Sequence, residues 1–196
     1  HMDEASGLIF SPSHFTWMDT NYPAGTPREG YPVEIQALWI HALKMAAGIE
    51  RKSGFAARAD QAEKSLKRLF VIKEGREQYL ADYLSAVSGQ SAEAAIPDDA
   101  LRPNQLLAVT MGAFRDSALC KGLLAACDEL LVPGGIRSLA DRKVRCEHPV
   151  LWMNRLLNVP DRPYIGRYIG DEDTRRKPAY HNGTAWTWLF PSFCEA

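Results

Sequence analysis

Residues 31–48 read YPVEIQALWIHALKMAAG, and this pattern is typical of an amphipathic helix. Pro32 suits the first turn of a helix, and Glu34 suits the positive charge of the same end. Apolar side chains then recur three and four positions apart, which places them on one stripe of the helix surface. They are Ile35, Leu38, Trp39, Ala42, Leu43 and Ala46. The stretch therefore predicts a long helix that packs through one face.

Similar apolar spacing continues along the chain, interrupted by glycine and proline. The predicted helices are residues 31–48, 55–71, 103–114, 117–131 and 182–194. Residues 78–87 instead predict a short strand, and residues 132–180 carry few regular signals. Helix pairs separated by long loops predict an all-α fold in which the loops gather over one mouth.

The composition is ordinary for a globular protein of one domain. The chain has 196 residues, of which 46% are hydrophobic and 24% are charged, and its formal net charge is −1. Because there is no excess of positive charge, nucleic acid and anionic membranes are not expected as partners. No stretch approaches the eighteen or so apolar residues that a membrane span needs.

The cysteines give no sign of a disulfide framework or a metal site. They are Cys120, Cys127, Cys146 and Cys194, with no C-x-x-C pair and no Cys/His cluster at zinc-ligand spacing. We therefore expect free thiols in a reducing compartment, a cytoplasmic location and no bound metal.

Four motifs occur in order along the chain and carry a resemblance to a known family. They are FTWMD at 15–19 with TPREGYPVEIQALW at 26–39, LRPNQ at 101–105, VPGGIRSL at 132–139 and AYHNGTAWTWL at 179–189. Together they resemble the C-terminal α-glucosidase (amylo-α-1,6-glucosidase) domain of glycogen debranching enzymes. By this resemblance the chain would be a fragment of that domain.

The resemblance implies an (α/α)6 toroid, of which residues 1–196 would form a part. In that interpretation residues 1–30 are an active-site loop region and residues 31–196 are a segment of the helical toroid. A partial toroid leaves apolar helix faces uncovered, which costs stability in proportion to the exposed area. We therefore expect either a homo-oligomer that covers these faces or a rearranged terminal helix that covers them within the chain.

The activity implied by the resemblance is glycoside hydrolysis. Members of the family hydrolyse α-1,6-linked glucose at branch points of glycogen or limit dextrin, with inversion and without a cofactor. The aspartate of their W-M-D motif is the catalytic acid, which points to Asp19 here, and their general base would lie outside this chain. Burial in an aromatic loop would raise the pKa of Asp19 and keep it protonated. The alternative is an aspartate that only caps a turn.

Seven further residues are candidates for substrate binding. They are Trp17, Arg28, Glu34, Arg102, Asn104, His181 and Trp186. Trp17 and Trp186 are expected to stack on glucose, whereas Trp39 and Trp188 fit a core better. Glu34 is expected to bind a sugar hydroxyl or Arg28, and the alternative is a first-turn charge on the helix dipole. Helix-entry hydrogen bonds are the alternative for the motif at 101–105.

Two other functions remain open at this point. One is a non-catalytic α-glucan binding module built on a truncated toroid. The other is a related toroidal glycosidase of different linkage specificity.

Overall fold

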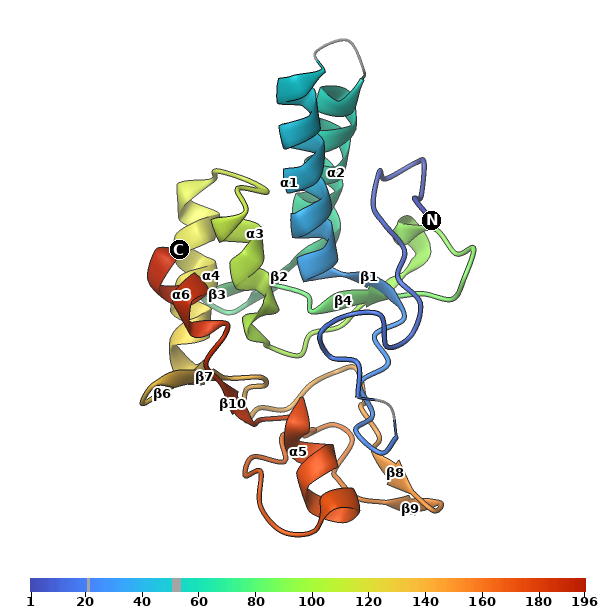
Figure 1. Ribbon diagram of the computed structural model, residues 1–196, viewed down its shortest axis with the longest axis vertical. Coiled ribbons are helices and arrows are strands. Elements are labelled where there is room, and N and C mark those ends of the chain that lie inside the picture. Colours follow the sequence, from blue (N-terminus) through green and yellow to red (C-terminus); the bar gives the residue numbers. More distant parts are fainter. Residues whose placement is uncertain (21, 51–53) are drawn as a thin grey trace.

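The computed structural model describes residues 1–20, 22–50 and 54–196. Its most prominent feature is an antiparallel helix pair, α1 (Val33–Ile49) and α2 (Phe55–Phe70), which projects from the rest of the molecule (Figure 1). In α2 the buried residues recur at helical spacing and include Ala59, Ala62, Leu66 and Phe70. The predicted helices 31–48 and 55–71 are therefore confirmed to within two residues at each end.

The strands form small antiparallel sheets below this helix pair in the view of Figure 1. One has the strand order β1 (Gly30–Pro32), β4 (Tyr83–Ser85), β5 (Ile96–Pro97). A second has the order β10 (Ala185–Trp186), β7 (Gly135–Arg137), β6 (Leu131–Val132). Two hairpins complete the set: β2 (Val71–Glu74) with β3 (Glu77–Leu80), and β8 (Leu151–Trp152) with β9 (Arg155–Leu156). The first two sheets join segments that are far apart in the sequence.

The remaining helices are short. They are α3 (Leu106–Thr110) after a 3-10 turn at Pro103–Gln105, α4 (Ser117–Cys127) before a 3-10 turn at Asp128–Leu130, a 3-10 turn at Ala92–Ala94, a π-helical turn at Glu172–Arg176 that leads into α5 (Lys177–Tyr180), and α6 (Phe190–Glu195). The Asp116 side chain caps α4 by accepting from the backbone N–H groups of Ala118 and Leu119, each at 3.1 Å.

The all-α prediction is wrong, and with it the interpretation as part of a toroid. The chain is 38% helical and 17% strand, with the strands in several antiparallel sheets. The prediction for 103–114 was too long, because Gly112 leaves the helix with φ of 61° and only residues 106–110 form α-helix. The strand predicted within 78–87 is confirmed as parts of β3 and β4.

The helix predicted for residues 182–194 is also wrong over its first half. Gly183 has φ of 133°, and a Cβ atom there would lie 2.6 Å from the Tyr164 ring. The backbone around Gly183 therefore turns, residues 185–186 pair as β10, and α6 begins only at Phe190. Packing of the backbone at Gly183 against Tyr164 therefore determines the conformation of this segment. The apolar spacing of the sequence alone could not predict that turn.

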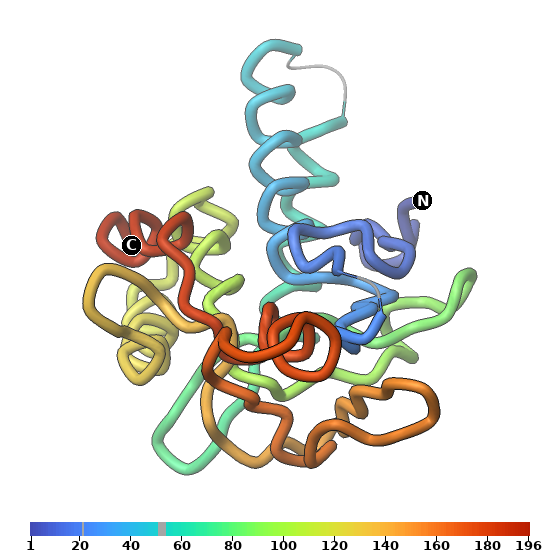
Figure 2. The backbone as a smooth tube through the Cα atoms, turned by 60° about the horizontal axis from the view of Figure 1, so that its bottom comes forward, coloured from blue at the N-terminus to red at the C-terminus, as the bar shows by residue number. Residues whose placement is uncertain are grey.

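The hydrophobic core lies where α1, α2, α3 and α4 meet the first sheet. Its fully buried members include Ile40, Leu66, Leu106 and Leu123. Phe193 of α6 packs against this core, and Figure 2 shows the red C-terminal segment beside the yellow-green segments of α3 and α4. A terminal helix thus covers part of the core within the chain.

The oligomeric state itself stays a prediction. In the described part of the chain, no helix is both long and apolar enough to cross a membrane.

Candidate functional site

The W-M-D loop is fixed on both sides of Asp19. Trp17 Nε1 donates to Asn104 Oδ1 at 2.8 Å, and Met18 is fully buried. After Asp19, Thr20 Oγ1 lies 3.0 Å from His181 Nε2. The first motif is therefore held against the second and the fourth.

Arg28 is the hub of a buried ion-pair network. Its Nη1 and Nη2 donate to the two carboxylate oxygens of Glu34 at 2.5 and 2.7 Å. Its Nε and Nη2 donate to the carboxylate of Asp82 at 2.7 and 3.0 Å, and Nη1 also donates to Thr16 Oγ1 at 3.0 Å. Arg28, Glu34 and Asp82 are each no more than 3% exposed. The guanidinium therefore has its donors occupied within the protein.

Asp82 also collects contacts from the LRPNQ motif. Asn104 Nδ2 donates to Asp82 Oδ1 at 2.7 Å, and Arg102 Nε lies 3.4 Å from Asp82 Oδ2. Arg102 further donates from Nη1 to the carbonyls of Ser138 and His181 and from Nη2 to Asn182 Oδ1. We call Arg28, Glu34, Asp82, Arg102 and Asn104 the Asp82 network. It ties together all four sequence motifs.

Burial and charge act in opposite directions on the two arginines. For Arg28, burial acts to lower the pKa, but the charges of Asp82 and Glu34 outweigh it and raise the pKa above its ordinary value. For Arg102, burial lowers the pKa, and Asp82 and Asp98 offset only part of that effect. Arg28 is therefore the better paired cation. The charge of Arg102 is stabilised more by the carbonyl groups that accept its hydrogen bonds.

His181 is almost fully buried between aromatic rings. Its ring lies edge-on to Trp17, with centroids 5.1 Å apart, and is stacked with Trp186 at 6.1 Å. Burial, together with the positive charges of Arg102 and Arg28, lowers the pKa of His181 to about 3. The imidazole is thus neutral near pH 7. Its Nδ1 is buried and has no hydrogen-bond partner among the described residues.

Three tryptophans form a partly exposed cluster beside His181. Trp17 lies edge-on to Trp186 and Trp188, with ring centroids 5.6 and 5.1 Å apart. Trp186 Nε1 donates to the carbonyl of Tyr180 at 3.1 Å, which fixes its ring. We call Trp17, Trp186 and Trp188 the tryptophan cluster. Trp188 is 44% exposed, so the prediction that it is a core residue is wrong.

Asp19 itself is exposed, whereas burial was expected for it. The carboxylate stands between the buried Met18 and the half-buried Thr20, so the backbone is anchored while the side chain faces outward. The burial argument for a protonated Asp19 therefore fails, and its role as an acid stays a prediction.

The structure brings the other predicted site residues together through direct contacts. The chain of contacts runs from Glu34 through Arg28, Asp82, Asn104 and Trp17 to His181 and Trp186. Two unpredicted residues complete it. Asp82 is a lone charge within the apolar run 79–84, which was the signal available, and no motif singled out Thr20. No group of His, Cys, Asp and Glu in the described ranges is arranged to hold a metal ion.

Comparisons with known proteins agree with the four motifs. A curated relative, the glycogen debranching enzyme of Saccharomyces cerevisiae (strain ATCC 204508 / S288c), is 26% identical over 238 residues. That match covers 100% of this chain but only 14% of the yeast protein. The family model described as Amylo-alpha-1,6-glucosidase matches residues 1–148 and 152–196. Since this match takes in nearly every residue, the chain belongs to the amylo-alpha-1,6-glucosidase family.

Proposed function

We propose that this chain forms part of a glycoside hydrolase site that cleaves α-1,6-linked glucose at branch points of an α-glucan such as glycogen or limit dextrin. Asp19 is the general acid in this proposal, and the reaction inverts the anomeric centre. The observation that supports it best is the setting of Asp19, an exposed carboxylate on a loop held by Trp17–Asn104 and Thr20–His181 contacts. Protonation of a leaving oxygen needs an acid that is both reachable and fixed.

The second carboxylate of the reaction lies outside this chain in our proposal. An inverting enzyme needs a general base roughly 6.5–9.5 Å from the acid, with a water molecule between them. The buried carboxylates of the site, Glu34 and Asp82, accept hydrogen bonds from Arg28 on both of their oxygens. A base held in this way would have to break a buried ion pair before it could take a proton.

In this proposal the tryptophan cluster contacts the sugar. Indole rings offer apolar faces to a pyranose, and these rings are partly exposed and held in place by ring contacts. Four buried polar residues contact other groups of the protein, so we assign them to positioning the loop. They are Arg28, Glu34, Arg102 and Asn104. His181 holds Thr20 and thereby the backbone next to Asp19.

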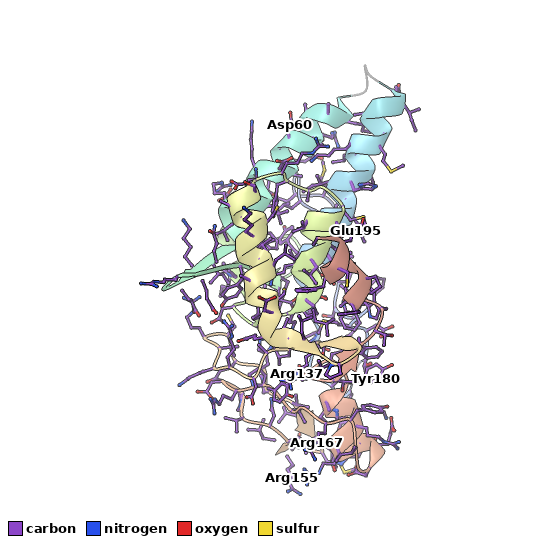
Figure 3. All side chains as sticks on the ribbon, turned by 90° about the vertical axis from the view of Figure 1, so that its left-hand side faces the viewer. Asp60, Arg137, Arg155, Arg167, Tyr180 and Glu195 are labelled. Carbon is purple, nitrogen blue, oxygen red and sulfur yellow. The ribbon has the colours of Figure 1, made fainter. Side chains whose placement is uncertain are left out.

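The test is glucose release from a phosphorylase limit dextrin by the protein that carries this chain. We expect Asp19→Asn to lower release by about 10²–10⁴-fold, the usual contribution of a general acid. The affinity for the dextrin, measured by calorimetry, is expected to stay within a few-fold. Asp60→Asn is the matched control, because Asp60 is an exposed aspartate on α2 and lies far in Figure 3 from Tyr180, whose ring contacts His181. Equal turnover in the two variants contradicts the assignment of Asp19.

A non-catalytic α-glucan binding role is the second candidate. It is favoured by the ion pairs that Glu34 and Asp82 form with Arg28, since both of these buried carboxylates are already engaged inside the protein. The same assay separates the candidates: dextrin binding without any Asp19-dependent glucose release supports the binder. Release from α-1,4-linked or other glucosides in preference to the dextrin supports a glycosidase of another linkage specificity.

A further inference from the structure

The β8–β9 hairpin contacts the loop that carries Asp19. The ring of Tyr22, on this loop, stacks on Trp152 of β8 with centroids 5.2 Å apart and an interplanar angle of 20°. The Tyr22 hydroxyl accepts a hydrogen bond from the Met153 N–H at 2.7 Å. In Figure 1 the hairpin lies directly below this loop. Tyr22 is therefore held both at its ring face and at its hydroxyl.

The stacked pair presents an open aromatic surface. Tyr22 is 53% exposed although its ring stacks on Trp152, so much of the residue remains accessible to solvent. The neighbouring Leu151 and Met153 are also exposed, at 48% and 78%. A rigid aromatic ring with an open face is a surface on which the apolar side of a pyranose can pack.

A polar side chain stands beside this aromatic surface. Arg155 of β9 pairs directly with Trp152 of β8, so the two side chains project from the same face of the hairpin. No hydrogen bond or ion pair engages the Arg155 guanidinium within residues 1–20, 22–50 and 54–196. Arg155 also lines a cavity of about 270 Å³ together with Leu156, Leu157, Thr174 and Arg175. In Figure 3 Arg155 lies at the lower end of the molecule and points outward.

We propose that Tyr22, Trp152 and Arg155 form a further subsite for an α-glucan, which binds glucose units outside the bond that is cleaved. The ring pair takes the apolar face of a glucose unit, and Arg155 donates hydrogen bonds to its hydroxyl groups. This inference rests on the proposed function, because it takes the α-glucan as the ligand of the Asp19 site.

Distance along the chain favours a glucan as the occupant. Tyr22 follows Asp19 by three residues, and three residues of extended chain span at most about 11 Å. A glucan chain that places a branch point at Asp19 passes within reach of a ring this close. A protein partner or a second copy of this chain would need a much larger contact, roughly 800 Å² from each side.

The test measures binding of maltoheptaose, a linear neutral α-glucan, by calorimetry in the Asp19→Asn background of the protein that carries this chain. We expect Tyr22→Ala to weaken binding by at least about tenfold, because it removes the aromatic surface. Arg155→Gln is expected to weaken binding several-fold and to leave the fold intact, since its side chain is exposed. Tyr22→Phe, which keeps the ring and loses only the hydroxyl, is expected to stay within about threefold.

Val159→Ala is the control for loss of exposed apolar surface near the hairpin, and it is expected to leave the affinity unchanged. Unchanged maltoheptaose binding in both Tyr22→Ala and Arg155→Gln overturns the proposal. So does self-association, seen by light scattering, that these variants abolish and maltoheptaose does not compete with. Because binding is read without turnover, this result is separate from whether Asp19 is the acid.

Discussion

The Asp82 network and the tryptophan cluster both take residues from the first sequence motif, yet the two regions differ in exposure. In the Asp82 network, Arg28, Asp82 and Asn104 are at most 2% exposed and their polar groups are bonded to one another. In the tryptophan cluster, Trp188 is 44% exposed and the rings contact each other mainly by their edges. The charged residues therefore lie inside, and the aromatic residues reach the surface.

The difference in exposure indicates that the two regions have different roles. A buried ion network is costly to break, so it fixes the positions of the loops that it joins. Partly exposed rings can meet a ligand without losing internal contacts. The two regions are coupled by the Trp17–Asn104 hydrogen bond and by the His181 carbonyl, which accepts from Arg102. We expect changes in the first region to act on stability and changes in the second to act on binding.

The largest effect is expected from removal of the carboxylate at the centre of the Asp82 network. Among the residues that the structure describes, Asp82→Ala leaves Arg28 with Glu34 alone as a paired carboxylate and leaves Arg102 with no carboxylate in an ion pair. Loss of one partner of a buried pair costs about 3–5 kcal/mol. Urea unfolding followed by circular dichroism measures the change in the free energy of unfolding.

An exposed ion pair provides the control for this prediction. Arg68 and Glu93 pair at the surface, and exposed pairs contribute about 0–1 kcal/mol. Glu93→Gln is therefore expected to change the free energy of unfolding far less than Asp82→Ala does. Similar losses in Asp82→Ala and Glu93→Gln are incompatible with a structural role for the buried network.

The next largest effect is a loss of stability in acid that depends on His181. Burial lowers the pKa of His181 from 6.5 to about 3 in the folded chain, so the unfolded chain binds a proton first as the pH falls. The stability present above pH 6.5 is therefore lost between pH 6.5 and 3, by about 1.4 kcal/mol per pH unit at most. Unfolding free energies at pH 7.0, 6.0 and 5.0 measure this slope.

His181→Gln removes the titrating group and is the control. Its unfolding free energy is expected to be lower than that of the parent protein at pH 7 and to fall less between pH 7 and 5. A variant with the same slope as the parent would place the acid sensitivity on other groups.

The sequence predicted the long helices of the fold and, apart from the strands within residues 78–87, missed the short strands. An amphipathic pattern over sixteen or seventeen residues, as in α1 and α2, is a strong signal because it repeats over several turns. Strands of two to four residues, such as β1 and β8, are too short to show a period of two. They form because distant segments meet, as residues 30–32 and 83–85 do. The prediction of an all-α toroid was wrong because the sequence pattern did not reveal these short strands.

In the candidate site, motifs identified residues but not their surroundings. The motifs named Arg28 and Glu34, and the structure shows that these two bind each other. Asp82 belongs to no motif, and only the structure shows its ion pairs with Arg28 and Arg102 and its hydrogen bond with Asn104. Trp186 and Trp188 would point apart on a helix, yet both contact Trp17 because this segment turns at Gly183 and is not helical until Phe190.

A smaller effect is expected from the hydrogen bond that couples the two regions. Trp17→Phe keeps an aromatic ring but removes the Nε1 donor, so Asn104 Oδ1 loses its partner at a fully buried position. An unsatisfied buried acceptor costs about 1–3 kcal/mol. Trp188→Phe, by contrast, changes an exposed ring and is expected to cost less than about 0.5 kcal/mol. Equal costs would show that Trp188, too, is fixed by burial.

The smallest effect, and the one opposite in sign, is expected at the turn of the β8–β9 hairpin. Met153 and Asn154 form this turn with φ of 43° and 61°, and two positive φ values are typical of a type I′ turn. Asparagine and glycine adopt this conformation easily, whereas methionine is strained in it. Met153→Asn is therefore expected to raise the free energy of unfolding by about 0.5–1 kcal/mol.

Met153 is 78% exposed, so the substitution removes few packing contacts. The backbone N–H that donates to Tyr22 is retained. Urea unfolding of Met153→Asn beside Met153→Ala separates turn strain from loss of the side chain: only the asparagine variant should gain stability. A gain in both variants, or in neither, would mean that strain at this turn does not limit the stability of the hairpin.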